Sequence, residues 1–257
     1  MKPFTSHTMN SLLALEPRSN VQISSMAIAL VGLALAPTLG AAQVTFETIL
    51  QDESLDGWHA VPEESKGDWT LTDGVLTGTG SQDRLAYLVW KNNQLKDFVL
   101  ELEYRLPGEG NTGVEIRCQE DTSGKRPFVG YHADLGHIGI GKNILGAWDF
   151  HFADRTEPPC PRGSSLSISS DGKFTHKPLD RSVRLEDIKD KDWNRVRIVA
   201  EAGRCEFYLN DKIASVFEDR AAEGRLETGG IALQIHDRGM TVQFRRIRLK
   251  ELNKDKL

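Results

Sequence analysis

The alternation of apolar and polar residues along Phe98–Leu106 is the feature that most constrains how this chain can fold. Every second residue from Phe98 onward is apolar, and Glu101, Glu103 and Arg105 lie between them. Successive side chains of a β-strand point to opposite faces, so this period of two predicts a strand with one buried side and one solvent-facing side. Similar runs recur at Trp69–Leu71, Val75–Thr77, Tyr87–Trp90, Gly113–Cys118, Tyr131–Leu135, Asn194–Glu201, Cys205–Leu209, Ile213–Phe217, Gly230–His236 and Thr241–Leu249.

Turn-forming residues separate these runs, for example at Asp73–Gly74, Pro107–Asn111 and Asn210–Asp211. About a dozen short strands at such spacing predict an all-β fold, in which two antiparallel sheets pack face to face as a jelly-roll sandwich. The stretch from Ile138 to Asp192 is rich in Gly, Pro and Ser and has no strong periodicity. Because it is too long for a plain connection, we expect short strands and a loop excursion over one sheet there.

The first residues of the chain differ from the rest. Met26–Leu39 is a continuous apolar run, followed by the small residues Gly40–Ala42. This pattern is typical of a secretion signal, so we predict a signal peptide over residues 1–42, a single β domain over residues 43–257, and an exported, periplasmic or extracellular protein. The run is shorter than the roughly 20 residues of a membrane span, so no stable span is expected after cleavage. An uncleaved anchor and a buried helix are the alternatives.

The charge balance argues against a nucleic-acid partner. The chain has 32 Lys and Arg residues against 37 Asp and Glu residues, for a formal net charge of −5. Proteins that bind the nucleic-acid backbone need a basic face, whereas the basic residues here are scattered.

Three cysteines, Cys118, Cys160 and Cys205, follow the predicted signal peptide. In an exported protein they allow one disulfide and leave one thiol. Their spacing does not decide the pairing.

Polar residues two positions apart on predicted strands are candidates for a binding site, because they share one face of a sheet. Four such pairs are Glu115 with Arg117, His132 with Asp134, Gln234 with His236, and Gln243 with Arg245. If these strands are neighbours, they form a concave polar face bordered by Trp148, Asp149 and His151. This mixture of side chains suits a sugar, since Arg and carboxylates bind hydroxyls and a Trp ring covers the apolar side of a pyranose. The alternative is that each pair is an ordinary solvent face.

Two of these segments also have the spacing of half a metal site. His132 with Asp134, and Asp149 with His151, each place an imidazole and a carboxylate on one strand face. A divalent metal ion is the one cofactor that the sequence suggests, with His132, Asp134 and His236 as candidate ligands.

Short motifs follow one another in order along the predicted domain: Leu55-Asp56-Gly57-Trp58, Asp73-Gly74-Val75-Leu76, Phe98–Arg105, Gly110–Val114 with Arg117, Trp193-Asn194, Leu209-Asn210, Gly230–His236 and Phe244–Leu249. This series resembles the 3-keto-disaccharide hydrolase domain family, whose members have a concanavalin A-like jelly roll. One departure lies in Gly130–Asp134, where His132 stands in place of the family's usual Glu or Gln.

The resemblance implies an enzyme that cleaves 3-keto-glucosides or 3-keto-disaccharides by hydrolysis or elimination, with an oligosaccharide or glycoside as its substrate. A C3 ketone acidifies the C2 proton, a base removes that proton, and the enolate expels the C1 substituent. We expect Asp134 or His132 as the base, Arg117 as the partner of the enolate oxygen, and His236 as the acid or a metal ligand. The residues expected to hold the sugar are Asn111, Glu115, Trp148, Asp149, Gln234 and Arg245.

Two other functions stay open at this point. Jelly rolls of this kind also serve as non-catalytic, lectin-like glycan-binding modules, and the fold alone does not decide between the two. An ordinary glycosidase would use Glu115 and Asp134 as its carboxylate pair.

Overall fold

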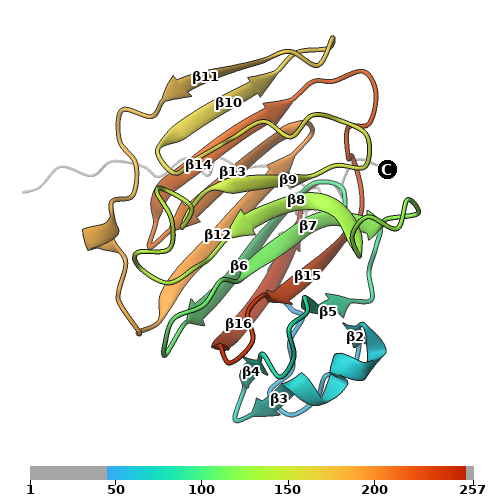
Figure 1. The fold of residues 1–257 in the computed structure, drawn as a ribbon, viewed down its shortest axis with the longest axis vertical. Coiled ribbons are helices and arrows are strands. Elements are labelled where there is room, and N and C mark those ends of the chain that lie inside the picture. Colours follow the sequence, from blue (N-terminus) through green and yellow to red (C-terminus); the bar gives the residue numbers. More distant parts are fainter. Residues whose placement is uncertain (1–44, 253–257) are drawn as a thin grey trace, which may run out of the picture. The chain divides into compact units, whose positions relative to one another are not determined.

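The computed structural model describes residues 45–252, which form two β-sheets packed face to face (Figure 1). The predicted signal peptide over residues 1–42 lies outside the described residues. The larger sheet has ten strands, in the order β11 (Phe174–Pro178), β10 (Ser164–Ile168), β14 (Lys212–Asp219), β13 (Arg204–Leu209), β12 (Asn194–Glu201), β6 (Phe98–Arg105), β16 (Thr241–Glu251), β4 (Val75–Thr79) and β3 (Trp69–Thr72), with β1 (Glu47–Thr48) paired to β16. The smaller sheet has six, in the order β2 (Trp58–Val61), β5 (Ala86–Trp90), β15 (Gly230–Ile235), β7 (Gly113–Glu120), β8 (Phe128–Asp134) and β9 (Trp148–His151).

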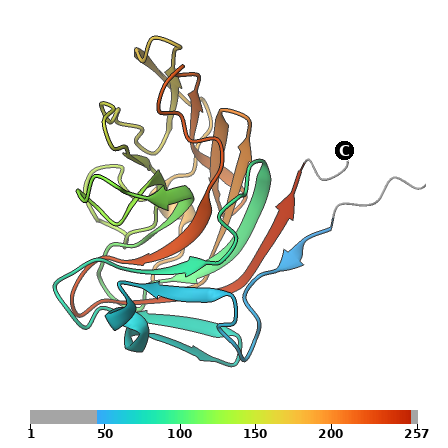
Figure 2. The same ribbon diagram turned by 90° about the vertical axis from the view of Figure 1, so that its right-hand side faces the viewer.

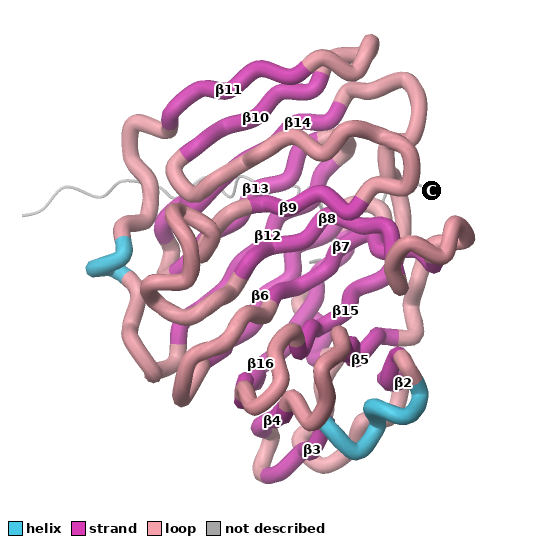
Figure 3. The backbone as a smooth tube through the Cα atoms, viewed as in Figure 1, coloured by secondary structure: helices cyan, strands magenta, loops and turns pink. Residues whose placement is uncertain are grey.

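The predicted all-β jelly-roll sandwich is confirmed, with one exception to the antiparallel pairing: β10 and β14 run parallel. The helical turns of the described residues are the 3-10 helices η1 (Glu63–Asp68) and η2 (Leu185–Asp187), drawn in cyan in Figure 3. No helix within residues 45–252 is long and apolar enough to span a membrane. Because η1 joins the edge strands β2 and β3, it links the two sheets at the end of the sandwich that Figure 2 shows in blue and teal.

The alternation in β6 produces the two-sided strand that the sequence predicts. Phe98, Leu100 and Leu102 are at most 1% exposed and face the other sheet. On the outer side, Glu101 pairs with Arg195 and Arg248, and Glu103 with Arg245 and Arg246. The burial of the apolar side is the main source of stability of such a sandwich, since each fully buried large aliphatic or aromatic side chain contributes about 1.5–3 kcal/mol.

The irregular stretch from Ile138 to Asp192 contains the short strands β9, β10 and β11 and the helix η2, as expected. Strands β10 and β11 widen the larger sheet, while β9 becomes the edge strand of the smaller one. This last placement matters for function, because it puts Asp149 and His151 on a strand beside β8.

The one disulfide that the cysteine count allows is not formed. Cys118, Cys160 and Cys205 are all buried free thiols. They belong to separate elements, since Cys118 is on β7, Cys205 is on β13 and Cys160 forms an isolated bridge with Trp148.

Candidate functional site

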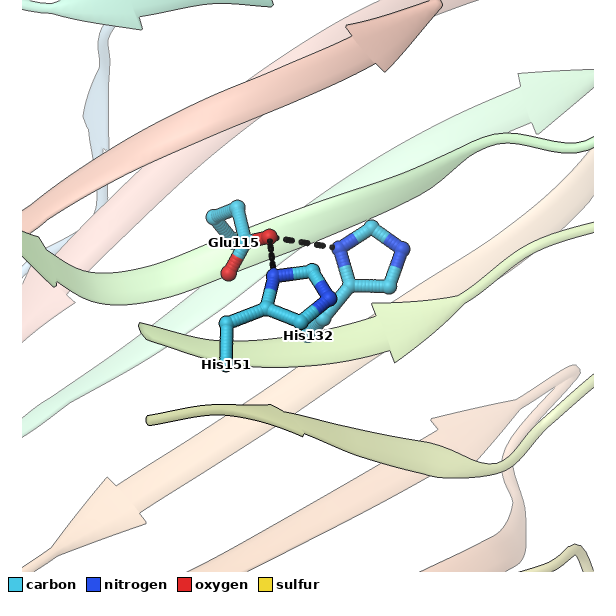
Figure 4. A group of neighbouring side chains, drawn as sticks. All are labelled: Glu115, His132 and His151. Atoms are coloured by element: carbon cyan, nitrogen blue, oxygen red, sulfur yellow. Dashed lines mark hydrogen bonds and ion pairs between the residues drawn. The ribbon is translucent and has the colours of Figure 1, made fainter. Parts of the chain in front are cut away.

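Three side chains from neighbouring strands of the smaller sheet converge at one point. The Nδ1 atoms of His132 (β8) and His151 (β9) lie 3.0 Å and 2.6 Å from the same oxygen, Oε1 of Glu115 (β7), as Figure 4 shows. The two imidazole rings are stacked, with centroids 5.2 Å apart. Glu115 is fully buried and His132 is 2% exposed, whereas the His151 side chain is 18% exposed. The group therefore reaches the surface at His151.

Strand register explains why these residues meet. Glu115 is paired with His132, and His132 with Asp149, so Glu115, His132 and Asp149 form one row across β7, β8 and β9. His151 lies two residues beyond Asp149 and therefore on the same outer face of the sheet. Tyr131 and Phe150 point the opposite way and pack into the core.

Two glycines clear the space that these side chains occupy. A Cβ atom on Gly113 would lie 2.2 Å from Nε2 of His132, and one on Gly130 would lie 2.5 Å from Oε2 of Glu115. Any larger residue at either position would displace the imidazole or the carboxylate. The absence of these two side chains is therefore part of the construction of the site.

The group has a strong internal charge pattern. Burial by itself would raise the pKa of Glu115, but the imidazoles of His132 and His151 hold it well below its usual range. Burial opposes protonation of both imidazoles, but the Glu115 carboxylate, helped by Asp134, raises the pKa of His132. Glu115 and Asp149 together raise the pKa of His151 to about 10. The arrangement therefore favours the ionised form of the Glu115 carboxylate and the protonated forms of both imidazoles.

A second carboxylate lies at each end of this arrangement. Asp134 Oδ1 is 3.6 Å from Nε2 of His132, and Asp149 Oδ2 is 3.5 Å from Nε2 of His151. Burial raises the pKa of Asp134 to about 6, whereas the interaction with His151 lowers the pKa of Asp149. Acids and imidazoles thus alternate across three strands, from Asp134 at one end to Asp149 at the other.

Glu115, His132 and His151 could also hold a metal ion. One ligand atom from each lies within 4.8 Å of the other two, and Oε2 of Glu115 has no hydrogen-bond partner within the described residues. Two imidazoles and one carboxylate are a donor set that zinc and other first-row divalent metals accept. The residues therefore fit such an ion. Asp134 flanks this set, and His236 does not belong to it.

Two more of the predicted sugar-binding residues present buried acceptor atoms. Gln234 lies on the outer face of β15, where its Nε2 donates to the Tyr87 hydroxyl at 2.9 Å, but its Oε1 has no partner in the part of the chain that is described. Asn111 precedes β7, and its side-chain Oδ1 is likewise buried without a partner among residues 45–252. Buried acceptors in folded proteins are almost always satisfied, so both atoms suit a ligand that brings hydroxyl groups.

The structure corrects the placement of Arg117. The sequence pattern puts it on the same face as Glu115, but the register of β7 shifts between Ile116 and Gln119, and Arg117 takes a φ of 49°. Its side chain is 1% exposed and is enclosed by backbone carbonyls and one carboxylate, those of Lys96, Ala202, Leu226 and Asp97. Arg117 ties three segments together and is not available to an enolate oxygen.

Trp148 and Arg245 are also placed wrongly by the sequence pattern. Trp148 is aligned with Ala133, so its ring faces inward and packs edge-on against Phe207 and Phe217 of the larger sheet. It is a core residue and cannot stack on a sugar. Arg245 is on β16 of the larger sheet, where it pairs with Glu103, and its guanidinium lies 4.0 Å from the centre of the Trp193 ring.

His236 lies just beyond β15, where its side chain is exposed and pairs with Asp237 at 2.7 Å. The sequence pattern favours it over His151, but it is His151 that joins Glu115 and His132. The spacing of Asp149 and His151 was the available signal for this. Tyr87, Gly113 and Gly130 were not identified, because apolar or small residues at strand positions carry no sign of a site.

Residues 45–250 match the family model of the 3-keto-alpha-glucoside-1,2-lyase-like domain. Two solved structures of candidate glycosyl hydrolases from Parabacteroides distasonis are similar: one has 19% identity, covers 81% of this chain and 100% of its own, and has a TM-score of 0.53, and the other has 18% identity, covers 81% and 94%, and has a TM-score of 0.54. A Bacillus subtilis protein with a galectin-like fold has 12% identity, covers 81% and 95%, and has a TM-score of 0.50. These likenesses show the fold. No curated protein is similar enough to count as a relative.

Proposed function

Because the chain belongs to the family of 3-keto-alpha-glucoside-1,2-lyase-like domains, we propose that it is an exported enzyme that cleaves the glycosidic bond of 3-keto-glucosides at the Glu115/His132/His151 group. The observation that carries the proposal is the row of alternating acids and imidazoles across β7, β8 and β9. A row of this kind can both accept and donate a proton at one face of a substrate.

Asp134 is the base in this proposal. The C2–H bond breaks, its proton goes to the Asp134 carboxylate, and its electron pair forms the enolate with the C3 carbonyl. Of the two carboxylates that contact His132, Asp134 has a side chain that is 11% exposed, whereas Glu115 is fully buried and occupied by two imidazoles. The same difference argues against an ordinary glycosidase that uses Glu115 and Asp134 as its pair, because Glu115 has neither access nor a proton to donate.

The imidazoles take the part that was expected of Arg117 on the basis of the family resemblance. The pKa of His151 is raised to about 10 and that of His132 is also raised, so the enolate oxygen meets positive charge at these imidazoles in a site of low dielectric. The C3 carbonyl then re-forms, the electron pair of the enolate makes a C1=C2 double bond, and the C1–O bond breaks. The electron pair of the broken bond leaves with the aglycone oxygen, and His151 donates the proton that this oxygen requires. Glu115 is a positioning residue, since it holds both rings in place.

Sugar hydroxyl groups would be held by the unpartnered acceptors. Oε1 of Gln234 and Oδ1 of Asn111 can each accept one hydroxyl hydrogen, and the partly exposed Asp149 carboxylate can accept another. A divalent metal ion, if bound, would be held by Glu115, His132 and His151, and would supply a Lewis acid for the C3 oxygen.

The test uses purified protein from Gln43 onward, incubated with a 3-keto-disaccharide and with its unoxidised parent, each with and without EDTA. Release of sugar from the keto form alone supports the proposal, and a loss of release with EDTA would show that the reaction needs a metal ion. Release from the unoxidised parent would refute the keto-sugar chemistry. Sugar binding without any release would move the protein to the lectin-like class.

A matched pair of variants tests the base. We expect Asp134→Asn to lower kcat by about 10²–10⁴-fold, the range that general bases contribute. Asp171→Asn, on an exposed turn between β10 and β11, is the control and should leave kcat unchanged. Equal rates for the two variants would remove Asp134 from the mechanism.

A further inference from the structure

We propose that the pocket between the β7–β8 hairpin and strands β2 and β5 is the aglycone subsite, and that it takes an aromatic aglycone rather than a second sugar; this rests on the proposed function. The pocket has a volume of about 760 Å³, which is within the range of sites for small organic ligands. Its wall has an apolar part, formed by Val61, Val89, Cys118 and Phe128, and a polar part that includes Asn93, Gln94, Gln119 and Arg126.

The pocket adjoins the Glu115/His132/His151 group on the same face of the smaller sheet. A Cβ atom on Gly130 would lie 2.5 Å from Oε2 of Glu115 and 3.4 Å from Cβ of Cys118, so only Gly130 separates the carboxylate from a wall residue of the pocket. Val89, another wall residue, is paired with Ala232 of β15, and Ala232 is in turn paired with Glu115 of β7, so one strand separates Val89 from Glu115. A group attached to C1 of a sugar at the site can therefore extend into the pocket.

The floor of the pocket, formed by Val89 and Cys118, is apolar, although it belongs to the outer face of the sheet. Tyr87, Val89, Cys118 and Ala232 point away from the core and form a second apolar cluster that is separate from the sandwich interior. Val61, Leu85 and Phe128 pack against this cluster. The four residues of this cluster are each at most 7% exposed, so the cluster is a covered apolar surface, and Val89 and Cys118 present it to the pocket.

The pocket wall is held firmly in place. The Phe128 ring meets Tyr87 edge-on at 5.3 Å, which folds the hairpin over β15 and β5. At the hairpin tip, Asp121 accepts hydrogen bonds from Ser123 and from the backbone of Arg126, and Arg126 pairs with Glu157 at 2.8 Å. The pocket is thus a built feature of the hairpin.

These contacts favour an aromatic ring over a sugar ring. A sugar carries hydroxyl groups around its edge, and the part of the pocket next to the Glu115/His132/His151 group, formed by Val89 and Cys118, does not replace the hydrogen bonds that those groups make to water. The polar wall residues, such as Asn93, Gln94 and Arg126, can bind polar substituents of an aromatic ring. A flat aromatic ring covers the same surface without that loss and can meet Phe128 edge-to-face. A phenolic oxygen is also a better leaving group than a sugar alkoxide, so little help from an acid is needed.

The first test measures binding of 4-nitrophenol by calorimetry, independently of any turnover. The variants are Phe128→Ala, which removes a wall residue, and Val89→Thr, which keeps the shape of the floor but adds a hydroxyl group. Val199→Thr, at a half-buried outward position of β12 on the other sheet, is the matched control. We expect both pocket variants to weaken binding by about tenfold and the control to leave it unchanged. No binding to the wild type, or equal binding to all four proteins, would overturn the proposal.

The second test separates this proposal from the proposed function. The wild type and Phe128→Ala are assayed with a 3-keto phenyl glucoside and a 3-keto-disaccharide. A loss of kcat/KM confined to the phenyl substrate supports the subsite, and an equal loss with both substrates refutes it. If the wild type cleaves neither substrate while 4-nitrophenol binding still depends on Phe128, the proposed function fails and the aromatic pocket stands.

Discussion

The replacement of Gly113 by Ala tests the geometry of the site most directly. The added Cβ would lie 2.2 Å from Nε2 of His132, whereas ordinary contact begins at 3.4 Å, so the ring would have to move by about 1.2 Å. The same Cβ would lie 2.7 Å from the backbone oxygen of Ala133, so a shift of the added methyl group toward Ala133 could not relieve the clash with His132. His132 would therefore lose its 3.0 Å contact with Oε1 of Glu115.

The cost of this change has two parts. Overpacking of a well-packed site costs about 1–3 kcal/mol, and a weakened hydrogen bond between charged groups costs about 1.5–3 kcal/mol. We expect Gly113→Ala to lose about 3 kcal/mol of the free energy of unfolding, which lowers Tm by about 6–12 °C in a domain of this size.

The assay is thermal unfolding followed by circular dichroism, together with turnover of the 3-keto-disaccharide by the folded variant. The control is Gly108→Ala, because an added Cβ there meets nothing within 4 Å and Gly108 has no left-handed backbone. Activity should fall for Gly113→Ala and persist for Gly108→Ala. A Gly113→Ala protein with wild-type Tm and turnover would show that the described packing around His132 is wrong.

Three further predictions concern residues outside the site. Arg117→Ala should destabilise the fold by about 3–5 kcal/mol, because Asp97 and three carbonyls lose a buried partner. Urea unfolding measures this loss, and a folded variant that keeps normal turnover would confirm a purely structural role. Trp148→Ala should cost about 3–5 kcal/mol through the core cavity it leaves, in the same unfolding assay; a cost below 1 kcal/mol would contradict its burial. Burial would raise the pKa values of Glu101 and Glu103, but their Arg partners hold both below the usual 4.5. The stabilisation that these ion pairs give is therefore present above about pH 4.5 and is lost as the pH falls further. The double variant Glu101→Gln, Glu103→Gln should show a smaller fall of Tm with acid, and an unchanged slope of Tm against pH would refute this.

The sequence pattern predicts most of the sheet architecture and the outer-facing position of the central site residues. Glu115, His132, Asp134 and Asp149 all lie on one face, as the period of two requires. The same rule misplaces Arg117, because a register shift in β7 breaks the alternation there. It also leaves open which sheet a strand joins, and for that reason it grouped Arg245 with residues of the other sheet.

The sequence by itself determined the all-β class, the strand segments and the side of each strand that is apolar. These properties are local, since they follow from the two-residue repeat of an extended chain. Only the tertiary structure decided that β9 lies beside β8, that His151 and not His236 reaches Glu115, and that Trp148 is a core residue. These outcomes depend on pairing and register between segments far apart in the chain, where a shift of one residue reverses the face that a side chain occupies.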